Sequence, residues 1–100
     1  RFREVRVRRL ADHTFWVRGD AQVFEGTVAY VVEDGHYRLA GGFTTAEHGA
    51  PEWGAFEFVV SYEPGPHGAQ TRPMLILYEE SAKTGAPTHE LVVPLELIRR

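Results

Sequence analysis

The 100-residue chain carries 43% hydrophobic and 12% aromatic side chains, enough to fill one core, so we expect a single folded domain spanning residues 1–100. Its net charge of −3 argues against a nucleic-acid-binding protein, because such proteins normally carry a strong basic excess. The absence of cysteine excludes disulfides, thiolate metal sites and cysteine nucleophiles, and no apolar run approaches the ~20 residues of a membrane span.

The first predicted strand is strongly basic. In REVRVRR (residues 3–9), Val5 and Val7 alternate with polar residues, which is typical of a half-buried strand. The arginines could contact phosphates or an anionic surface, but the simpler interpretation is that they solvate an edge strand and prevent edge-to-edge pairing. They are Arg1, Arg3, Arg6, Arg8 and Arg9. Because the chain begins at Arg1 rather than Met, we also expect it to be excised from a longer protein.

The next segments continue the alternation. HTFWVRG (residues 13–19) directs Phe15 and Val17 inward and Trp16 to the opposite side. Residues 26–43 predict a hairpin whose first arm buries Val28, Tyr30 and Val32.

The sequence also indicates how this hairpin turns and returns. The dipeptide Asp34-Gly35 predicts a tight type I′ turn. In the returning arm, Gly41 and Gly42 indicate a bulge or a close backbone approach.

The second half of the chain predicts three more strands. After a Gly- and Pro-rich loop at residues 47–54, AFEFVVSY (residues 55–62) places alternate residues on one inward face, namely Phe56, Phe58, Val60 and Tyr62. EPGPHG (residues 63–68) cannot continue a strand, and PMLILYEE (residues 73–80) is typical of a strand buried on both faces. HELVVPLELI (residues 89–98) directs Leu91, Val93, Leu95 and Leu97 inward, with Pro94 outward as at an edge strand or bulge.

No window shows an 11-residue helical period. About seven antiparallel strands separated by turns therefore predict an all-β sandwich with no significant helix.

Residues 77–85 suggest catalysis at first, because Lys83-Thr84-Gly85 also occurs in serine β-lactamases and penicillin-binding proteins. A lysine base needs a pKa near neutrality and therefore burial, but Lys83 sits in a predicted exposed turn. The Ser-x-x-Lys motif is also missing, since neither Ser61 nor Ser81 has a lysine three residues later. We therefore expect a turn between two strands and no catalytic residue.

Metal binding is weakly supported by the sequence. The five histidines, His13, His36, His48, His67 and His89, show no ligand spacing, so we expect no zinc site and no cofactor. The acidic pairs at residues 33–34 and 79–80 lack a calcium-loop frame, and calcium at one end of the sandwich is left open.

Exposed aromatics offer a different kind of site. Trp16 points away from its inward neighbours, and Trp16 or Trp53 could form a platform for a sugar ring. The simpler interpretation is that aromatics fill the core or cover its ends.

Four stretches in order, residues 19–28, 33–35, 53–62 and 77–85, followed by VVPLEL, resemble the immunoglobulin-like domain of bacterial spore germination. This family is found with germination-protein-M-type domains in envelope lipoproteins, and the resemblance covers roughly residues 5–98. LADHTF (residues 10–15) replaces the Pro/Gly-rich opening of other members, which affects only the first loop. The matching signature residues are Phe24, Glu25, Gly26, Trp53, Gly54, Phe56, Glu57, Glu79, Ser81, Lys83 and Gly85.

The resemblance implies an immunoglobulin-like sandwich without catalysis, placed outside the membrane in an envelope lipoprotein whose anchor lies outside this fragment. It implies contacts with an envelope protein or a cell-wall component, and it names neither the ligand nor the oligomeric state. The alternative is a glycan- or peptidoglycan-binding module that uses the exposed aromatics.

The signature residues then have a structural interpretation. We expect Glu25 and either Glu79 or Glu80 to accept hydrogen bonds from loop N–H groups at the end of the sandwich. Ser81 should begin the turn, and Gly85 should take a positive φ.

Overall fold

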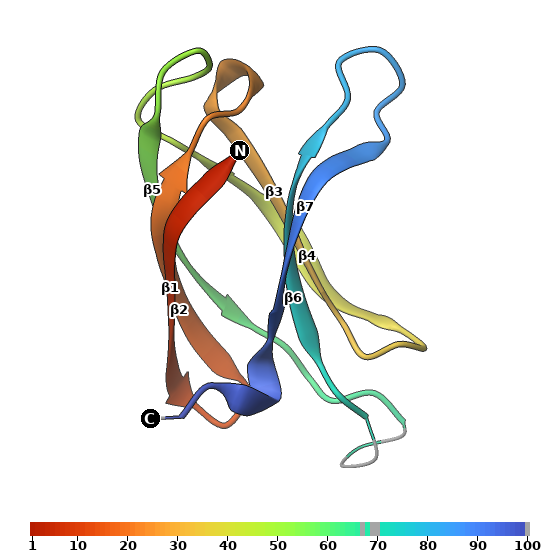
Figure 1. The fold of residues 1–100 in the computed structure, drawn as a ribbon. Helices are drawn as coiled ribbons and strands as arrows, with labels where there is room; N and C mark the ends of the chain where they lie inside the picture. The colour runs from red at the N-terminus through yellow and green to blue at the C-terminus, as the bar shows by residue number, and fades with distance from the viewer. Residues whose placement is uncertain (67, 69–70, 100) are drawn as a thin grey trace.

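Alternation of apolar and polar residues produces seven strands in the computed structural model, which describes residues 1–66, 68 and 71–99. They form a three-stranded sheet in the order β1-β2-β5 and a four-stranded sheet in the order β4-β3-β6-β7 (Figure 1). Every pairing is antiparallel. The bounds are β1 Phe2–Ala11, β2 Thr14–Ala21, β3 Thr27–Glu33, β4 Arg38–Thr45, β5 Gly54–Ser61, β6 Met74–Glu80 and β7 Pro87–Pro94.

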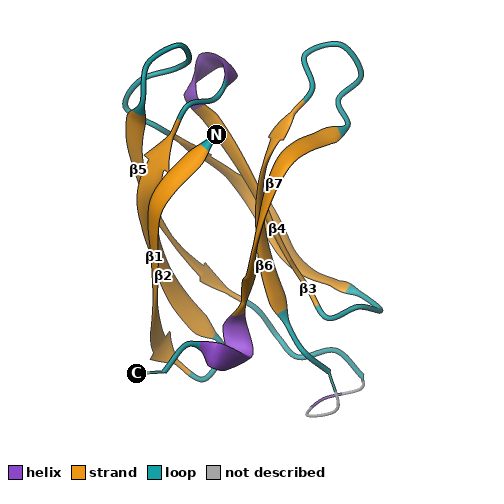
Figure 2. Ribbon diagram, in the orientation of Figure 1, coloured by secondary structure: helices purple, strands orange, loops and turns teal. Residues whose placement is uncertain are grey.

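The two sheets face each other, and the chain termini lie at opposite ends of the sandwich (Figure 1). Figure 2 shows the helical turns η1 (Phe24–Gly26), directly before β3, and η3 (Leu95–Leu97), directly after β7. The predicted all-β sandwich is therefore confirmed, and β1, β5, β4 and β7 are its edge strands.

Most of the core consists of side chains that the sequence predicted to be inward by alternation or, in β6, to be buried on both faces. The Tyr30 ring of β3 stacks on the Phe58 ring of β5 with centroids 4.2 Å apart, which joins the two sheets. Full burial of each large apolar side chain stabilises the fold by roughly 1.5–3 kcal/mol. The largest fully buried residues are Phe15, Val17, Val23, Val28, Val32, Leu75, Leu77 and Leu95.

The β3–β4 turn differs from the prediction. Its central residues are Gly35 and His36, because the Asp34 N–H donates to the Tyr37 carbonyl at 3.1 Å. Of the two central residues, only Gly35 has a positive φ, 92°, whereas a type I′ turn requires a positive φ at both. Asp34 lies directly before the two central residues. There its Oδ1 accepts hydrogen bonds from the N–H groups of His36 and Tyr37, which hold the turn together.

The glycines of β4 form no bulge. Gly41 and Gly42 pair regularly with Val31 and Tyr30, and the register shift of this pair of strands falls at the other end of β4, beside Glu33. Side chains rather than backbone approach these glycines: the Arg38 side chain lies across Gly41, and the Tyr30 hydroxyl lies against Gly42.

The C-terminal prediction fails at one residue. Leu91, Val93 and Leu95 face the core as expected, but Leu97 is 69% exposed. Strand β7 ends at Pro94, and the 3-10 turn η3 has about three residues per turn, so the period of two no longer applies.

Candidate functional site

The family signature gathers at the upper end of the sandwich in Figure 1, where Glu79 ties four segments together. Its Oε2 accepts a hydrogen bond from the Phe24 N–H at 2.7 Å, and its Oε1 lies 3.4 Å from Nε of Arg1 and 3.1 Å from Nδ1 of His89. The Glu79 carbonyl also accepts the Thr88 hydroxyl at 2.9 Å. The predicted role of a carboxylate that holds a loop N–H is confirmed for Glu79.

The same prediction is wrong for Glu25. Within the part of the chain that the structure describes, its exposed side chain makes no hydrogen bond or ion pair. Glu25 instead has a φ of 54°, so its backbone helps to form the η1 turn. Phe24, the residue before it, is 57% exposed.

Two signature glycines allow close packing of the loop at residues 46–53, Gly26 against η1 and Gly54 at the start of β5. Gly26 has a φ of 70°, and its carbonyl accepts a hydrogen bond from the Ala46 N–H at 2.7 Å. A side chain at Gly54 would collide with the backbone of His48. Gly26 lies where η1 meets this loop, and Gly54 lies where the loop folds back on the start of β5, so both positions require glycine.

The turn between β6 and β7 is a hydrogen-bonded turn and not a catalytic pair. The Ser81 Oγ accepts from the backbone N–H groups of Lys83 at 3.2 Å and Thr84 at 3.4 Å, and Gly85 has the expected positive φ of 74°. The Lys83 side chain is exposed, so it lacks the burial that a lysine base requires.

The outer side of β1, β2 and β5, hereafter the arginine face, carries both candidate tryptophans. Trp16 is half-buried; its Nε1–H donates to Oε2 of Glu57, and the Arg8 guanidinium lies 5.3 Å from its ring centroid. The Arg3 guanidinium lies 4.0 Å over the Trp53 ring. An arginine therefore lies over each candidate sugar platform.

Sugar binding through Trp16 or Trp53 stays a prediction.

Phe56, another residue of the family signature, is only 2% exposed and belongs to the core.

The outer side of β4, β3, β6 and β7, hereafter the apolar face, is hydrophobic across all four strands. Strand register places Gly41, Val31, Ile76 and Val92 in one row and Phe43, Ala29 and Tyr78 in the next. Phe43 is 60% and Val92 47% exposed, whereas Ile76 between them is only 8% exposed. The apolar residues of β6 are thus buried on both parities as predicted, although no second layer covers Ile76.

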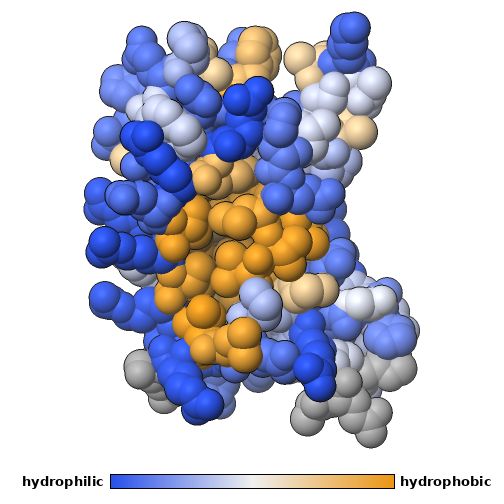
Figure 3. All heavy atoms as spheres, viewed as in Figure 1, coloured by the Kyte–Doolittle hydropathy of each residue, from blue (hydrophilic) through white to orange (hydrophobic). Residues whose placement is uncertain are grey.

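Figure 3 shows hydrophobic side chains reaching the surface between the edge strands β1 and β7. The half-buried inward residues of these strands are Val5, Val7, Leu91 and Val93. Both edges are protected against addition of another strand. Strand β1 has arginines and a register shift where Glu4 has a φ of 52°, and β7 has Pro94 and a φ of 54° at His89.

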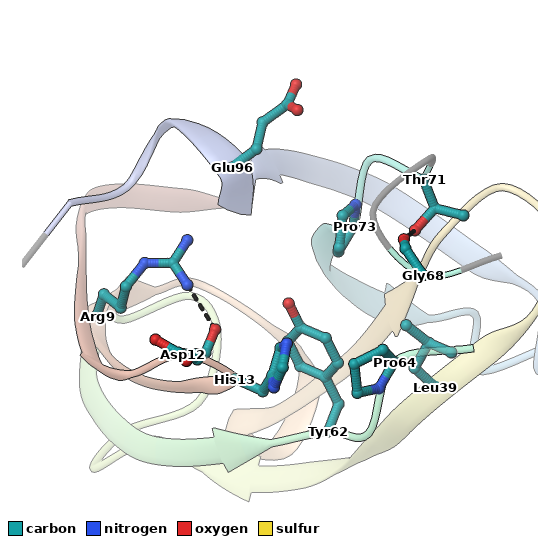
Figure 4. A pocket seen from close by; sticks show the side chains of 10 residues that line it. All are labelled: Arg9, Asp12, His13, Leu39, Tyr62, Pro64, Gly68, Thr71, Pro73 and Glu96. Atoms are coloured by element: carbon teal, nitrogen blue, oxygen red, sulfur yellow. Dashed lines mark hydrogen bonds between the residues drawn. The ribbon is translucent and has the colours of Figure 1, made fainter. Parts of the chain in front are cut away.

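A pocket of about 290 Å³ opens at the other end of the sandwich, between Arg9, His13 and Tyr62 (Figure 4). The Arg9 guanidinium donates to the carbonyls of Asp12, Leu95 and Ile98, so it clamps β1 to the C-terminal turn. Burial raises the pKa of the Tyr62 hydroxyl above its ordinary value, and the positive charge of Arg9 acts in the opposite direction. The arginine of this pocket is thus already engaged by the fold.

Two further observations concern ligands and membranes. Within residues 1–66, 68 and 71–99, no three His, Asp or Glu side chains cluster closely enough to hold a metal ion. His67, one of the histidines considered above, lies outside the described residues. None of the described helical segments is long and apolar enough to cross a bilayer.

Sequence reasoning missed the apolar face and the Arg9 clamp. The apolar face could have been recognised in the sequence, because Val31, Ile76 and Val92 are apolar at outward positions, where alternation predicts polar residues. The contacts of Arg9 with the C-terminal turn could not have been recognised, because Arg9 and Ile98 are 89 residues apart in the sequence.

Comparison with known proteins supports the same fold. The family model described as an immunoglobulin-like domain of bacterial spore germination matches residues 7–86. No curated protein and no solved structure matches the chain significantly.

Proposed function

Because this chain belongs to the family of immunoglobulin-like domains of bacterial spore germination, we propose that it is a non-catalytic, extracytoplasmic module that binds a partner protein of the cell envelope. The observation that carries the proposal is the apolar face, where Phe43 and Val92 stand exposed on either side of Val31 and Ile76. Phe43 and Val92 leave apolar side chains in contact with water on the same face, and exposed apolar side chains gathered on one face of a soluble domain are typical of an interaction site.

The chemistry of this face favours protein over sugar. Its central residues, Ala29, Val31 and Ile76, carry no side-chain donor or acceptor, whereas sugar recognition needs hydrogen bonds to hydroxyl groups. Protein interfaces, in contrast, combine an apolar centre with a polar rim.

Charges around the apolar face narrow the kind of partner. By strand parity, Glu33, Glu80 and Glu90 are outward on this sheet, and Arg38 lies across Gly41. An acidic rim fits a partner whose contact surface is apolar in the centre and basic at its edge. A second copy of this chain would place glutamates against glutamates, which costs free energy.

Three observations support a role without catalysis. Lys83 and the Ser81 turn are exposed, and the Arg9 guanidinium of the pocket at the lower end of the sandwich is bonded to backbone carbonyls. The fold presents flat sheet faces, which suit contact with another macromolecule. Membrane attachment would then depend on an anchor outside residues 1–100.

A matched pair of variants tests the proposal. Val92→Asp places a charge on the apolar face, and Val59→Asp places one on the arginine face at a valine of similar exposure, 47% against 55%. The immobilised domain is exposed to detergent-solubilised envelope proteins of a spore-forming bacterium, and captured protein is identified and titrated in purified form.

We expect Val92→Asp to weaken binding of that protein at least tenfold, about 1.4 kcal/mol, and Val59→Asp to leave it unchanged. Melting temperatures of both variants establish that each is folded. Equal binding by both variants would contradict the proposal. Retention on purified cell wall that is lost in Trp16→Ala and Trp53→Ala would instead favour the glycan-binding alternative.

A further inference from the structure

The arginine face has a regular arrangement of outward side chains. Across the β1–β2 pair, Arg3 lies opposite Asp20, Arg6 opposite Arg18, and Arg8 opposite Trp16. Across the β2–β5 pair, Arg18 lies opposite Glu57. Four arginines therefore occupy neighbouring outward positions on two strands.

Among the described residues, a carboxylate lies within 4 Å of only one of these arginines. Nε of Arg3 lies 3.5 Å from Oδ2 of Asp20. Glu57 faces Arg18 across the strands, but its Oε2 accepts the Trp16 indole N–H. Among the described residues, Arg6 and Arg18 form no ion pair within 4 Å.

This arrangement has a cost for the free protein. Like charges directly opposite each other on antiparallel strands are destabilising, and a guanidinium keeps its charge at physiological pH. Arg6 and Arg18 therefore repel each other, and the repulsion is relieved when an anion lies between them. A hollow of about 430 Å³ is available there, lined by the two arginines, the Trp16 ring, Gly19 and the carboxylates of Glu4 and Asp20.

The spacing fits successive phosphate groups better than one isolated anion. Neighbouring strands lie about 4.8 Å apart, and alternate residues of one strand about 6.7 Å apart. Guanidinium groups bind phosphate oxygens in a bidentate manner. Arg6 and Arg18 can share one phosphate, and Arg8, whose guanidinium lies 5.3 Å from the Trp16 ring centroid, can hold the next.

We propose that the arginine face binds a linear polymer of phosphodiester-linked polyol or sugar units, with Arg6 and Arg18 as the central anion contacts. A flat anionic membrane fits less well, because Glu4, Asp20 and Glu57 lie among the arginines and would meet its negative surface. A thin chain can follow the arginines and avoid these carboxylates. The site goes beyond the proposed protein-binding function and uses the opposite sheet.

The test measures binding of purified poly(glycerol phosphate) to the domain at two salt concentrations. We expect the Arg6→Gln/Arg18→Gln double variant to bind at least tenfold more weakly and to show a smaller salt dependence than the wild type. Arg38→Gln, an arginine of the other sheet, is the matched control and should bind within twofold of the wild type. Val92→Asp should also bind normally, which separates this site from the apolar face.

Further arms use phosphatidylglycerol vesicles, single-stranded DNA, polyglutamate and neutral dextran. Weaker binding to each of these than to poly(glycerol phosphate) supports the proposal. Undetectable polymer binding, or equal binding by the double variant, overturns it. Tighter binding to vesicles, to DNA or to polyglutamate also overturns it, since the face would then serve a membrane, a nucleic acid or a carboxylate polymer.

Discussion

The two outer faces of the sandwich present different chemistry although both belong to antiparallel sheets around the same core. On β1, β2 and β5 the outward positions are mainly charged, and Arg6, Arg8 and Arg18 stand in water. On β3 and β6 the central outward positions are apolar, and Ile76 is nearly buried although the described residues form no second layer over it. Alternation of apolar and polar residues therefore explains the core and the arginine face. The apolar face departs from this alternation, which is why we interpret it as a contact surface.

The largest effect should separate an inner from an outer phenylalanine. Phe56→Ala removes a ring that is 2% exposed and should lower the free energy of unfolding by about 3–5 kcal/mol. Phe43→Ala removes a ring that is 60% exposed on the apolar face, and should change stability by no more than about 0.5 kcal/mol. Urea denaturation of both variants measures the difference, and similar losses would show that the apolar face is a second core surface.

A smaller effect is expected at the end of the sandwich that joins the two sheets. Glu79→Ala leaves the Phe24 N–H without its acceptor and removes the partner of Arg1 and His89, so we expect a loss of about 1–3 kcal/mol. The neighbouring Glu80→Ala, at an exposed outward position, should cost no more than about 0.5 kcal/mol. Equal shifts of the melting curve in both variants would contradict the role of Glu79 as the residue that ties the loops together.

The inner side of the three-stranded sheet can be probed by pH. Burial raises the pKa of Tyr62 above its ordinary value of 10.0, so the folded protein retains the phenol proton where the unfolded chain has lost it. The stabilisation is fully present below about pH 10 and is lost as the pH rises through the folded pKa.

Urea denaturation from pH 8 to pH 11 should therefore show a steeper loss of stability for the wild type than for Tyr62→Phe. Tyr37→Phe, at a ring that is 48% exposed, is the control and should follow the wild type. Parallel pH profiles for all three proteins would contradict this assignment.

The smallest effect concerns repulsion on the arginine face. Arg6→Gln removes one of two like charges directly opposite each other and should stabilise the fold by about 0.2–1 kcal/mol. Arg3→Gln on the same strand removes the ion pair with Asp20, and should leave stability unchanged or lower it by up to about 1 kcal/mol. Both effects should shrink in 1 M salt, where exposed charges are screened. A loss of stability in Arg6→Gln would contradict the arrangement.

Much of this fold could be predicted from residues that alternate. The sequence predicts Phe15, Val17, Val28 and Val32 in the core because apolar residues recur at every second position and the residues between them are polar or face away. Leu97 was misplaced because a pattern continues past Pro94 in the sequence while the strand does not. The sequence predicts Asp34 and Gly35 as the central residues of the β3–β4 turn. The Asp34 side chain instead accepts hydrogen bonds from the N–H groups that follow it, and the centre of the turn lies one residue later, at Gly35 and His36.

The candidate site was less predictable than the fold. Glu79 and Ser81 accept the backbone hydrogen bonds that the sequence predicted for them. The hydrogen bond predicted for the Glu25 side chain does not form, and Glu25 contributes to the η1 turn through its positive φ. Neither outer face could be identified as a unit, because each depends on strand register across the sheet. The adjacency of Arg6 and Arg18, twelve residues apart, exists only once β1 and β2 are paired.

The most direct test of the contrast between the two faces is photo-crosslinking from one position on each. A photoreactive amino acid is placed at Phe43 on the apolar face or at Val59 on the arginine face, both more than half exposed, and the domain is irradiated with isolated spore envelopes. We predict a discrete protein adduct from position 43 and none from position 59. Adducts to the same protein from position 59, or no adduct from position 43, would contradict the assignment of the apolar face as the protein-binding surface.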